Sequence, residues 1–324
     1  MTNQLELKVT AREQLTDDII GLTFESCTGE ALPCWQPGAH VELALEPFLN
    51  VGDSTSNDTI LRHYSLCGDP SNSQQWKIAI LKEENGRGGS QFIHNKVKVG
   101  DVIKVSEPRN HFSFNSRKKC LFIAGGIGIT PILPMIRQAQ AEGIDWRLVY
   151  LSRERNRLAF LDQLGGYDST RVILHGDKED GPISLATLLA DCDGDTCVYS
   201  CGPKRLLDAL EESAAAQSEW ALYIERFSSG PIDTTGASFD VVINSTGQRF
   251  SITEGESILV VLRAAGINIP ISCRNGVCGS CETGVLSGVP DHRDSILSPE
   301  EREENNFMML CVSRAFTPEL VLDL

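Results

Sequence analysis

Four cysteines near the C-terminal end of the chain have a spacing that can bind a metal cluster. Cys273, Cys278 and Cys281 form the pattern C-x4-C-x2-C, and Cys311 follows after 29 further residues. This is the ligand pattern of plant-type [2Fe–2S] clusters, in which four thiolates hold two irons. Two glycines within the loop allow it to curl, because glycine adopts backbone angles that other residues resist. Structural zinc usually has paired C-x2-C knuckles, and only one pair here is so spaced, so the pattern favours an iron–sulfur site.

A second group of residues that could do chemistry lies in the first third of the chain. Arg62-His-Tyr-Ser-Leu66 places a guanidinium, a flat aromatic ring and a hydroxyl in one short predicted strand. Such a set can hold a phosphate, stack on a ring and hydrogen-bond to a heteroatom, although it is also common on plain sheet surface. About twenty residues later, the predicted strand Lys77–Leu81 leads to Asn85–Ser90, whose glycine amides, arginine and serine suit a phosphate at the start of a helix. Together, the two motifs favour a flavin phosphate site.

A third motif combines a strand, a glycine-rich turn and a helix. The apolar strand Lys119–Ala124 runs into Gly125-Gly-Ile-Gly-Ile-Thr-Pro131, and a helix is predicted to continue through Ala141. Thr130 is expected to cap this helix, and Pro131 suits its first turn. Such an arrangement directs backbone N–H groups toward a pyrophosphate. Because the glycines do not match G-x-G-x-x-G, the motif alone does not identify a nucleotide site.

The elements around these motifs predict two different architectures. Short strands separated by turn residues, up to about position 112, predict a small antiparallel barrel. Apolar strands that alternate with helices then predict a doubly wound parallel sheet, whose ligands bind at the carboxyl ends of its strands. The barrel strands include Leu5–Thr10, Ile19–Phe24 and His40–Leu45, with a loop at 48–60; the parallel strands are Lys119–Ala124, Trp146–Leu151, Arg171–His175, Cys197–Cys201 and Ala221–Glu225.

The last part of the chain reads as a separate module. Ser228–Gly236 has the composition of a linker. A hairpin and a helix at Glu256–Ala265 are predicted before the cysteine loop, and Met308–Val312, around the fourth cysteine, reads as a buried strand edge. We therefore expect a flavin-binding β-barrel at 1–115, an NAD-binding α/β domain at 116–228, a linker at 229–236 and a [2Fe–2S] domain at 237–324.

Composition and charge argue against several classes of protein. The 324 residues include 44 acidic and 29 basic side chains, for a net charge of −15, and nucleic-acid phosphates would repel such a chain. The N-terminus lacks an apolar signal region, and the longest uncharged run, Cys120–Ile136, is broken by glycines and prolines. The other cysteines are scattered, so a reducing cytoplasm is expected. His292-Arg-Asp294 matches a fragment of the kinase catalytic loop, but the accompanying kinase motifs are missing.

The three modules in this order resemble the phthalate dioxygenase reductase family over essentially the whole chain. The resemblance implies a C-terminal β-grasp ferredoxin domain of plant type. It also implies a reductase that carries FMN, uses NADH and feeds a separate terminal Rieske-type oxygenase. With the charge and composition above, we expect a cytoplasmic monomer with no nucleic-acid or membrane partner. The matching motifs are Arg62–Leu66, Gly86–Ser90, Gly125–Pro131, Cys201–Pro203, Glu225–Phe227, the four cysteines, Asp291–Asp294 and the final Val321–Leu324.

The same resemblance assigns roles to individual residues. FMN would be held by Arg62, Tyr64, Ser65, Gly88, Gly89 and Ser90, with Thr130 close to the flavin and Phe227 packed against its ring. NADH would be received by Gly126, Gly128, Cys201 and Gly202, with Cys201 near the nicotinamide. The expected cofactor-binding set also includes His63, Ile78, Ala79, Arg87, Gly125, Pro203 and Glu225. The expected catalytic residues are Ser65, Thr130, Cys201 and Phe227, and the expected metal ligands are Cys273, Cys278, Cys281 and Cys311.

Some choices stay open from the sequence. Ser152–Arg155 contains more arginine than an NADH site needs, which keeps NADPH as an alternative. Asp177, just beyond the third strand of the parallel sheet, could bind ribose hydroxyls and favours NADH. FMN rather than FAD rests on the resemblance. The organic substrate of the partner, whether phthalate, vanillate, carnitine or another small acid, is a property of the partner and not of this sequence.

A mechanism follows from the expected parts. A nicotinamide gives up two electrons together, as hydride, and a [2Fe–2S] cluster accepts one at a time, so a flavin is needed between them to divide the pair. From position 229 onward there are 13 acidic and 6 basic residues, and we expect this acidic module to dock on a basic oxygenase surface. Two alternatives have other functions: a stand-alone quinone or ferric reductase, and a redox sensor that binds the cofactors without turnover.

Overall fold

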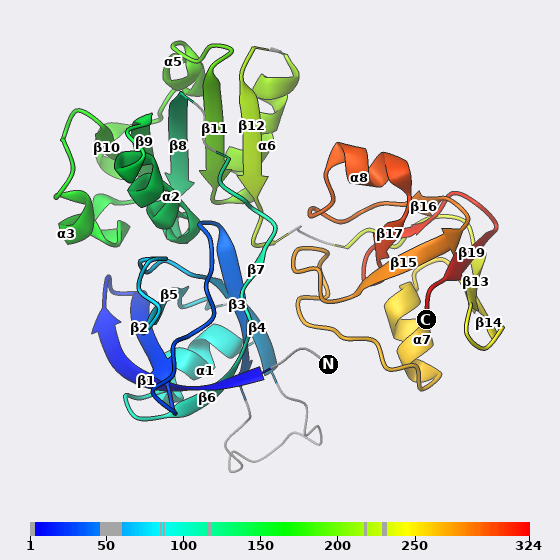
Figure 1. Cartoon of the computed structure of the whole chain (residues 1–324). Helices are drawn as coiled ribbons and strands as arrows, with labels where there is room; N and C mark the ends of the chain where they lie inside the picture. The colour runs from blue at the N-terminus through cyan, green and yellow to red at the C-terminus, as the bar shows by residue number, and fades with distance from the viewer. Residues whose placement is uncertain are drawn as a thin grey trace. The chain divides into compact units, whose positions relative to one another are not determined.

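The computed structural model of the chain describes residues 4–45, 60–84, 86, 88–115, 118–216, 219–228 and 232–324. The chain divides into two compact units, Met1–Glu225 and Arg226–Leu324 (Figure 1). Each unit has hydrophobic cores of its own. The predicted loop at 48–60 lies outside the described residues apart from Ile60, and so do Asn85 and Arg87 of the predicted phosphate motif.

The first half of the first unit is an antiparallel barrel, as the sequence predicts. Its sheet has the order β4-β3-β6-β1-β2-β5, and β7 pairs with β3. Leu66, just after β4, bridges Ile78 of β5, so the two edge strands meet and nearly close the barrel. The strands are β1 (Gln4–Gln14), β2 (Ile19–Ser26), β3 (Ala39–Leu45), β4 (Ile60–Ser65), β5 (Trp76–Leu81), β6 (Val102–Ser106) and β7 (Arg109–Asn110), and α1 (Gly89–Lys96) packs on their core through Ile93.

The second half of the first unit is a five-stranded sheet of order β10-β9-β8-β11-β12. All its strand pairs are parallel, which confirms the predicted doubly wound sheet. The strands are β8 (Lys119–Gly125), β9 (Asp145–Ser152), β10 (Val172–Gly176), β11 (Thr196–Cys201) and β12 (Ala221–Glu225). The helical segments are η1 (Gly126–Gly128), α2 (Ile129–Ala141), η2 (Arg155–Arg157), α3 (Leu161–Leu164), α4 (Asp177–Asp180), α5 (Leu185–Leu189) and α6 (Lys204–Ala215). The central strands β8 and β11 are buried almost throughout because both faces of the sheet are covered.

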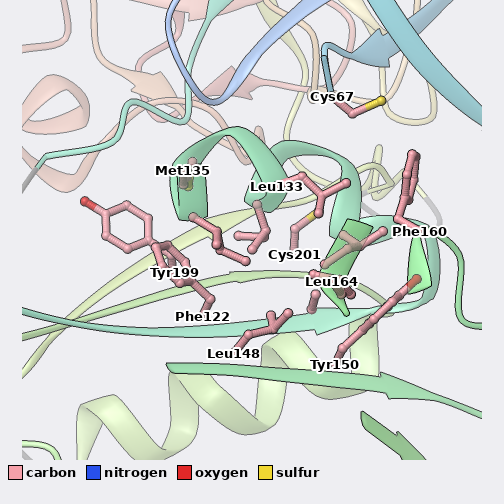
Figure 2. Packing of buried hydrophobic residues seen from close by; sticks show 14 of the residues in the cluster. Cys67, Phe122, Leu133, Met135, Leu148, Tyr150, Phe160, Leu164, Tyr199 and Cys201 are labelled. Carbon is pink, nitrogen blue, oxygen red and sulfur yellow. The ribbon is translucent and has the colours of Figure 1, made fainter. Parts of the chain in front are cut away.

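One core joins the barrel to the parallel sheet. On one face of the sheet, Phe122, Leu148 and Tyr199 pack with residues of α2, as Figure 2 shows. Barrel residues belong to the same cluster: Ile19, Cys67 and Ala79 are all nearly inaccessible to solvent. On the other face, residues of α5 and α6 pack in a separate cluster. The shared core explains why the barrel and the sheet form one compact unit.

The second unit is a mixed sheet covered by a helix. Its sheet has the order β14-β13-β19-β15-β17, in which only β13 and β19 run parallel. The elements are β13 (Phe239–Ile243), β14 (Arg249–Ile252), α7 (Ile258–Ala264), β15 (Glu282–Ser287), β16 (Pro290–Asp291), α8 (Pro299–Glu304), β17 (Phe307–Met309), β18 (Arg314–Ala315) and β19 (Glu319–Leu322). The apolar face of α7 packs into the core. This is the β-grasp arrangement that the resemblance implies.

A buried arginine holds the second unit together. Arg314 is 2% exposed, and its guanidinium donates to the carbonyl oxygens of Glu256 at 2.7 Å, Ala237 at 3.1 Å and Thr253 at 3.3 Å. It also lies over the ring of Phe239, 5.2 Å from the centroid. A buried charge is tolerated only when its hydrogen-bonding groups are satisfied, and here the acceptors come from two separate segments, at 237 and at 253–256.

Two local predictions are wrong. Thr130 does not cap α2: a short 3₁₀ turn moves the helix start, so Thr130 is the second helical residue and its hydroxyl donates to Ile127 O at 2.9 Å. Cys311 does not lie on a strand edge, because β17 ends at Met309. No helix in the described part of the chain is long and apolar enough to span a bilayer.

Candidate cofactor sites

The start of α1 and the guanidinium of Arg62 form one candidate phosphate site. Arg62 lies on β4 and turns toward the helix: a Cβ atom at Gly89 would lie 2.3 Å from Arg62 Nε. Glycine is therefore needed for the guanidinium to lie against the first turn of α1. Gly88 precedes the helix with a φ of 80°, and no side chain caps it. A cation beside the uncapped N–H groups of a helix suits a phosphate.

Successive residues of β4 point to opposite faces of the sheet. Tyr64 packs against the barrel core, and burial raises the pKa of its hydroxyl, with Arg62 partly offsetting the effect. His63 lies on the other face, where its ring contacts the Glu42 carboxylate at 3.2 Å. Ser65 shares that second face. The four side chains of the predicted flavin motif therefore divide into two pairs.

Ser65, Glu225 and Cys201 meet at the carboxyl ends of the parallel strands. Cys201 and Glu225 end β11 and β12 and lie directly opposite each other. Burial raises the pKa of Glu225 to about 8, and the nearby Ser65 hydroxyl opposes this rise. Burial also holds the pKa of the Cys201 thiol well above its usual range, and Glu225 adds to this rise once it is ionised. At neutral pH this site contains a neutral thiol and a largely protonated carboxyl group.

Two polar atoms of this site fit a polar ring. Ser65 Oγ and Glu225 Oε2 are buried close to each other, and neither has a further hydrogen-bond partner among the described residues. Buried polar atoms in proteins are nearly always paired. A flavin or nicotinamide ring carries donors and acceptors along its edge and could pair with both. The Cys201 side chain, by contrast, belongs to the hydrophobic core (Figure 2).

Glycines bring the turns after β8 and β11 into backbone contact. A Cβ atom at Gly128 would lie 2.2 Å from Cys201 O, and one at Gly125 would lie 2.5 Å from Pro203 Cδ. A Cβ atom at Gly202 would lie 2.9 Å from Gly125 Cα. The strand order reverses between β8 and β11, and ligands of doubly wound sheets bind at this switch point. The contacts suit a pyrophosphate, which needs a close approach to backbone N–H groups.

Other expected site residues lie in more varied positions. Ile78 and Ala79 are buried in cores, so they could contact a cofactor only through their backbones. Asp177 follows β10 with an exposed carboxylate. The Ser90 hydroxyl accepts from Glu83 N at 3.0 Å and stays able to donate to a phosphate. Phe227 belongs to the second unit and is 43% exposed.

The four cysteine thiols of the second unit lie beside one another. Cys273 neighbours Cys278 and Cys311, and Cys281 neighbours Cys311. These neighbouring thiols lower the pKa of Cys273 and of Cys281. Asn275 N also donates to Cys273 Sγ at 3.3 Å. The thiols are neighbours in pairs; in the described ranges, no group of three or more His, Cys, Asp or Glu side chains could hold a single metal ion.

The loop that carries three of these cysteines has a shape only glycine permits at two positions. Gly276 and Gly279 have φ values of 66° and 72°, in the left-handed region. A Cβ atom at Gly276 would also lie 2.6 Å from Val312 Cγ2. Together with the amide that faces a sulfur, this curled loop fits a four-thiolate cluster.

The sequence analysis missed one residue that shapes this loop. Asp294 is buried, and a Cβ atom at Gly276 would lie 3.0 Å from Asp294 Cα. Its carboxylate accepts from Leu297 N at 2.9 Å and Ile296 N at 3.1 Å, and Ser295 N donates to Gly276 O at 2.9 Å. In the sequence, Asp294 stands out only as the last residue of Asp291–Asp294, a segment that matches the family and also contains a fragment of the kinase catalytic loop, and neither match assigns it a role.

Comparisons with known proteins cover both units. The family of 2Fe-2S iron-sulfur cluster binding domains matches residues 241–316. The carnitine monooxygenase reductase subunit of Escherichia coli (strain K12) is 39% identical over 324 residues, which cover 98% of each chain.

Solved structures that are similar over 99% of this chain include a reductase and a cytochrome P450 monooxygenase. Phthalate dioxygenase reductase, described as a modular structure for electron transfer from pyridine nucleotides to [2Fe-2S], is 35% identical, with a TM-score of 0.70 and 98% of its own chain covered. An intact type IV self-sufficient cytochrome P450 monooxygenase is 37% identical, with a TM-score of 0.90 and 41% of its own chain covered.

Proposed function

This chain belongs to the phthalate dioxygenase reductase family, and from this premise we propose that it is the reductase component of a Rieske-type oxygenase system. It is an iron–sulfur flavoprotein oxidoreductase that takes electrons from NADH through FMN and a [2Fe–2S] cluster to a separate terminal oxygenase. The observation that carries the proposal is the pairing, in one chain, of the Ser65–Glu225–Cys201 site with a four-thiol loop. The oxygenase would act on phthalate, vanillate, carnitine or a similar small acid.

Residues of the barrel would hold the flavin. The Arg62 guanidinium and the N–H groups at the start of α1 would neutralise its phosphate, and Gly89 keeps the two close. Tyr64 would supply an aromatic surface, and Ser65 a hydroxyl for the ring edge. When bound, FMN accepts electrons from NADH as a pair and passes them on singly to a [2Fe–2S] cluster.

Residues at the carboxyl ends of the parallel strands would position the nicotinamide. The loops with Gly126, Gly128 and Gly202 would receive the pyrophosphate. The Cys201 thiol, packed in the hydrophobic core at the end of β11, stays neutral because burial keeps its pKa high. Glu225, with a pKa of about 8, holds a proton at neutral pH and can donate it in a hydrogen bond. Since the uncharged ring of NADH provides no counter-charge for a buried ion, neutral groups suit this site.

The partner and the setting are further parts of the proposal. Residues from 229 onward carry 13 acidic and 6 basic side chains, and this acidic unit would dock on a basic surface of the oxygenase. The chain would work in the cytoplasm as a monomer. The rate of electron transfer to the oxygenase should then fall as salt screens the attraction; a rate that does not change with salt would contradict this docking mode.

An anaerobic titration with NADH tests the proposed function. In the wild type, NADH should bleach the flavin absorbance and produce the electron paramagnetic resonance signal of a reduced [2Fe–2S] cluster. Cys311→Ser should keep flavin bleaching but lose the cluster signal and the reduction of cytochrome c. Cys27→Ser removes an exposed cysteine outside the loop and should behave like the wild type. Equal loss of flavin and cytochrome c reduction in Cys311→Ser would contradict the proposed order of transfer.

A further inference from the structure

The strand order determines where the adenosine half of a dinucleotide can lie. With the nicotinamide near Cys201 and Glu225 on β11 and β12, and the pyrophosphate between β8 and β11, the chain of the nucleotide runs across the carboxyl edge of the sheet. The strands on the far side are β9 and then β10. The adenine ribose therefore reaches the loops after Ser152 and Gly176. This placement rests on the proposed function.

An ion pair with two parallel hydrogen bonds lies at this edge. Arg155 Nε donates to Asp180 Oδ2 at 2.9 Å, and Arg155 Nη2 donates to Asp180 Oδ1 at 2.6 Å. Gly176 N donates to the same carboxylate at 2.9 Å. The Arg155 guanidinium, followed by the Gly176 amide, lowers the pKa of Asp180 to about 2. Asp180 is thus ionised at any working pH, and its arginine partner is engaged.

Backbone contacts hold the arginine in this place. A Cβ atom at Gly176 would lie 2.8 Å from Arg155 N, so the loop after β9 lies directly on the end of β10. Lys178 N donates to Arg153 O at 3.0 Å, and the Lys178 ammonium binds the Glu154 carboxylate at 2.5 Å. The two loops are therefore joined on both sides of Arg155, and its backbone cannot move far.

The charges at this edge favour a neutral ribose over a phosphorylated one. The two loops carry four carboxylates, those of Glu154, Asp177, Glu179 and Asp180, and four cations, those of Arg153, Arg155, Arg157 and Lys178. Three of these cations already bind carboxylates: Arg155 that of Asp180, Lys178 that of Glu154, and Arg157 that of Asp18. A 2′-phosphate would need a guanidinium in this position, whereas ribose hydroxyls can donate to a carboxylate such as that of Asp177.

We propose that the Arg155–Asp180 ion pair makes this chain selective for NADH over NADPH. The pair keeps the guanidinium from a 2′-phosphate and places a fixed negative charge beside it. By its sequence, the arginine-rich segment after β9 could bind a phosphate. Because Asp180 binds Arg155, this segment instead disfavours the 2′-phosphate of NADPH. Loss of the Asp180 charge should release Arg155 and allow it to bind the phosphate.

Binding of small adenosine ligands tests the proposal without any redox reaction. Isothermal titration calorimetry would compare adenosine 2′,5′-bisphosphate with adenosine 5′-monophosphate. Asp180→Asn should bind the 2′-phosphorylated ligand about tenfold more tightly than the wild type, as expected for one new charge-assisted contact, with little change for the monophosphate. The double variant Asp180→Asn/Arg155→Gln should lose this gain, because the released arginine provides it.

Control variants separate the possible causes. Asp191→Asn removes a carboxylate from another arginine–aspartate pair, with Arg147 at 3.3 Å, near the amino ends of the strands, and should leave both affinities unchanged. No gain in Asp180→Asn, with unchanged thermal unfolding, would overturn the proposal. A gain that persists in the double variant would also overturn it, because then charge removal and not Arg155 is the cause. If NADH fails to reduce the wild-type flavin, the proposed function itself fails.

Discussion

Glu225 should make the first unit less stable as the pH rises. Its carboxyl group has an ordinary pKa of 4.5 and, because of burial, a pKa of about 8 in the folded chain. Between these values the folded state binds more protons than the unfolded state, so the free energy of unfolding falls with increasing pH. Glu225→Gln removes the ionisable group and should remove this pH dependence.

The size of the effect follows from the two pKa values. At about 1.4 kcal/mol per pH unit, Glu225 lowers the free energy of unfolding by about 4 kcal/mol between pH 5 and pH 9. Relaxation around the charged carboxylate and entry of water reduce this value, so it is an upper limit. We expect Glu225→Gln to be more stable than the wild type by about 2 kcal/mol at pH 9, and by much less at pH 5.

Tryptophan fluorescence can follow this unit alone. All four tryptophans, Trp35, Trp76, Trp146 and Trp220, lie before position 226. Urea unfolding followed by their emission, from pH 5 to pH 9, therefore reports the first unit, while visible absorbance would report the cluster in the second.

A matched variant controls for the loss of one negative charge. Glu6 lies on β1 with an exposed side chain, and Glu6→Gln should follow the wild-type curve. Parallel pH curves for Glu225→Gln and the wild type would refute the reasoning, because the carboxyl group would then titrate alike in both states.

Three further substitutions test packing at the sites. Gly89→Ala should weaken FMN binding about tenfold or more, because its Cβ would overlap Arg62; FMN fluorescence on release measures this. Gly128→Ala should destabilise the first unit by about 1–3 kcal/mol and raise the KM for NADH, because its Cβ would meet Cys201 O; urea unfolding and steady-state kinetics measure both. Arg314→Met should destabilise the second unit by about 3 kcal/mol, because carbonyl oxygens lose their donor; cluster absorbance on heating measures this.

Each of these substitutions has an informative control. Gly21→Ala would place its Cβ no closer than 3.4 Å to a flexible lysine side chain, and FMN binding should not change. Arg263→Met removes an exposed arginine from α7 and should leave the cluster signal as stable as in the wild type. A Gly89→Ala protein that binds FMN normally, or an Arg314→Met protein in which both units lose stability equally, would count against these contacts.

The sequence predicts best where the chemistry is local. The cysteine loop is short, and its two glycines predict a curled backbone. In the structure both glycines have positive φ values. The contact between Ser65 and Glu225 could not be derived from spacing, because it joins the end of a barrel strand to the end of a parallel strand. Thr130 was misplaced because a 3₁₀ turn moves the helix start by two residues, and capping rules do not foresee such a turn.

The arginines after β9 show another limit of sequence reasoning. A run of arginine suggests an anion site, but whether a guanidinium is available depends on its neighbours in space. Asp180 lies 25 residues after Arg155, in the short helix α4 that follows β10, and no local pattern links the two. Register between parallel strands decides this pairing, and register is a property of the whole sheet.

The core shared by the barrel and the parallel sheet determines which fragments of the chain can fold on their own. A fragment that stops before β8 would leave Ile19, Cys67 and Ala79 without the side chains that cover them, so it should aggregate. A fragment that stops at Glu225 keeps that core whole. Expressed alone, residues 1–225 should therefore fold into a working diaphorase, an enzyme that oxidises NADH and reduces dyes. This fragment could then be fused to other electron carriers in place of the second unit.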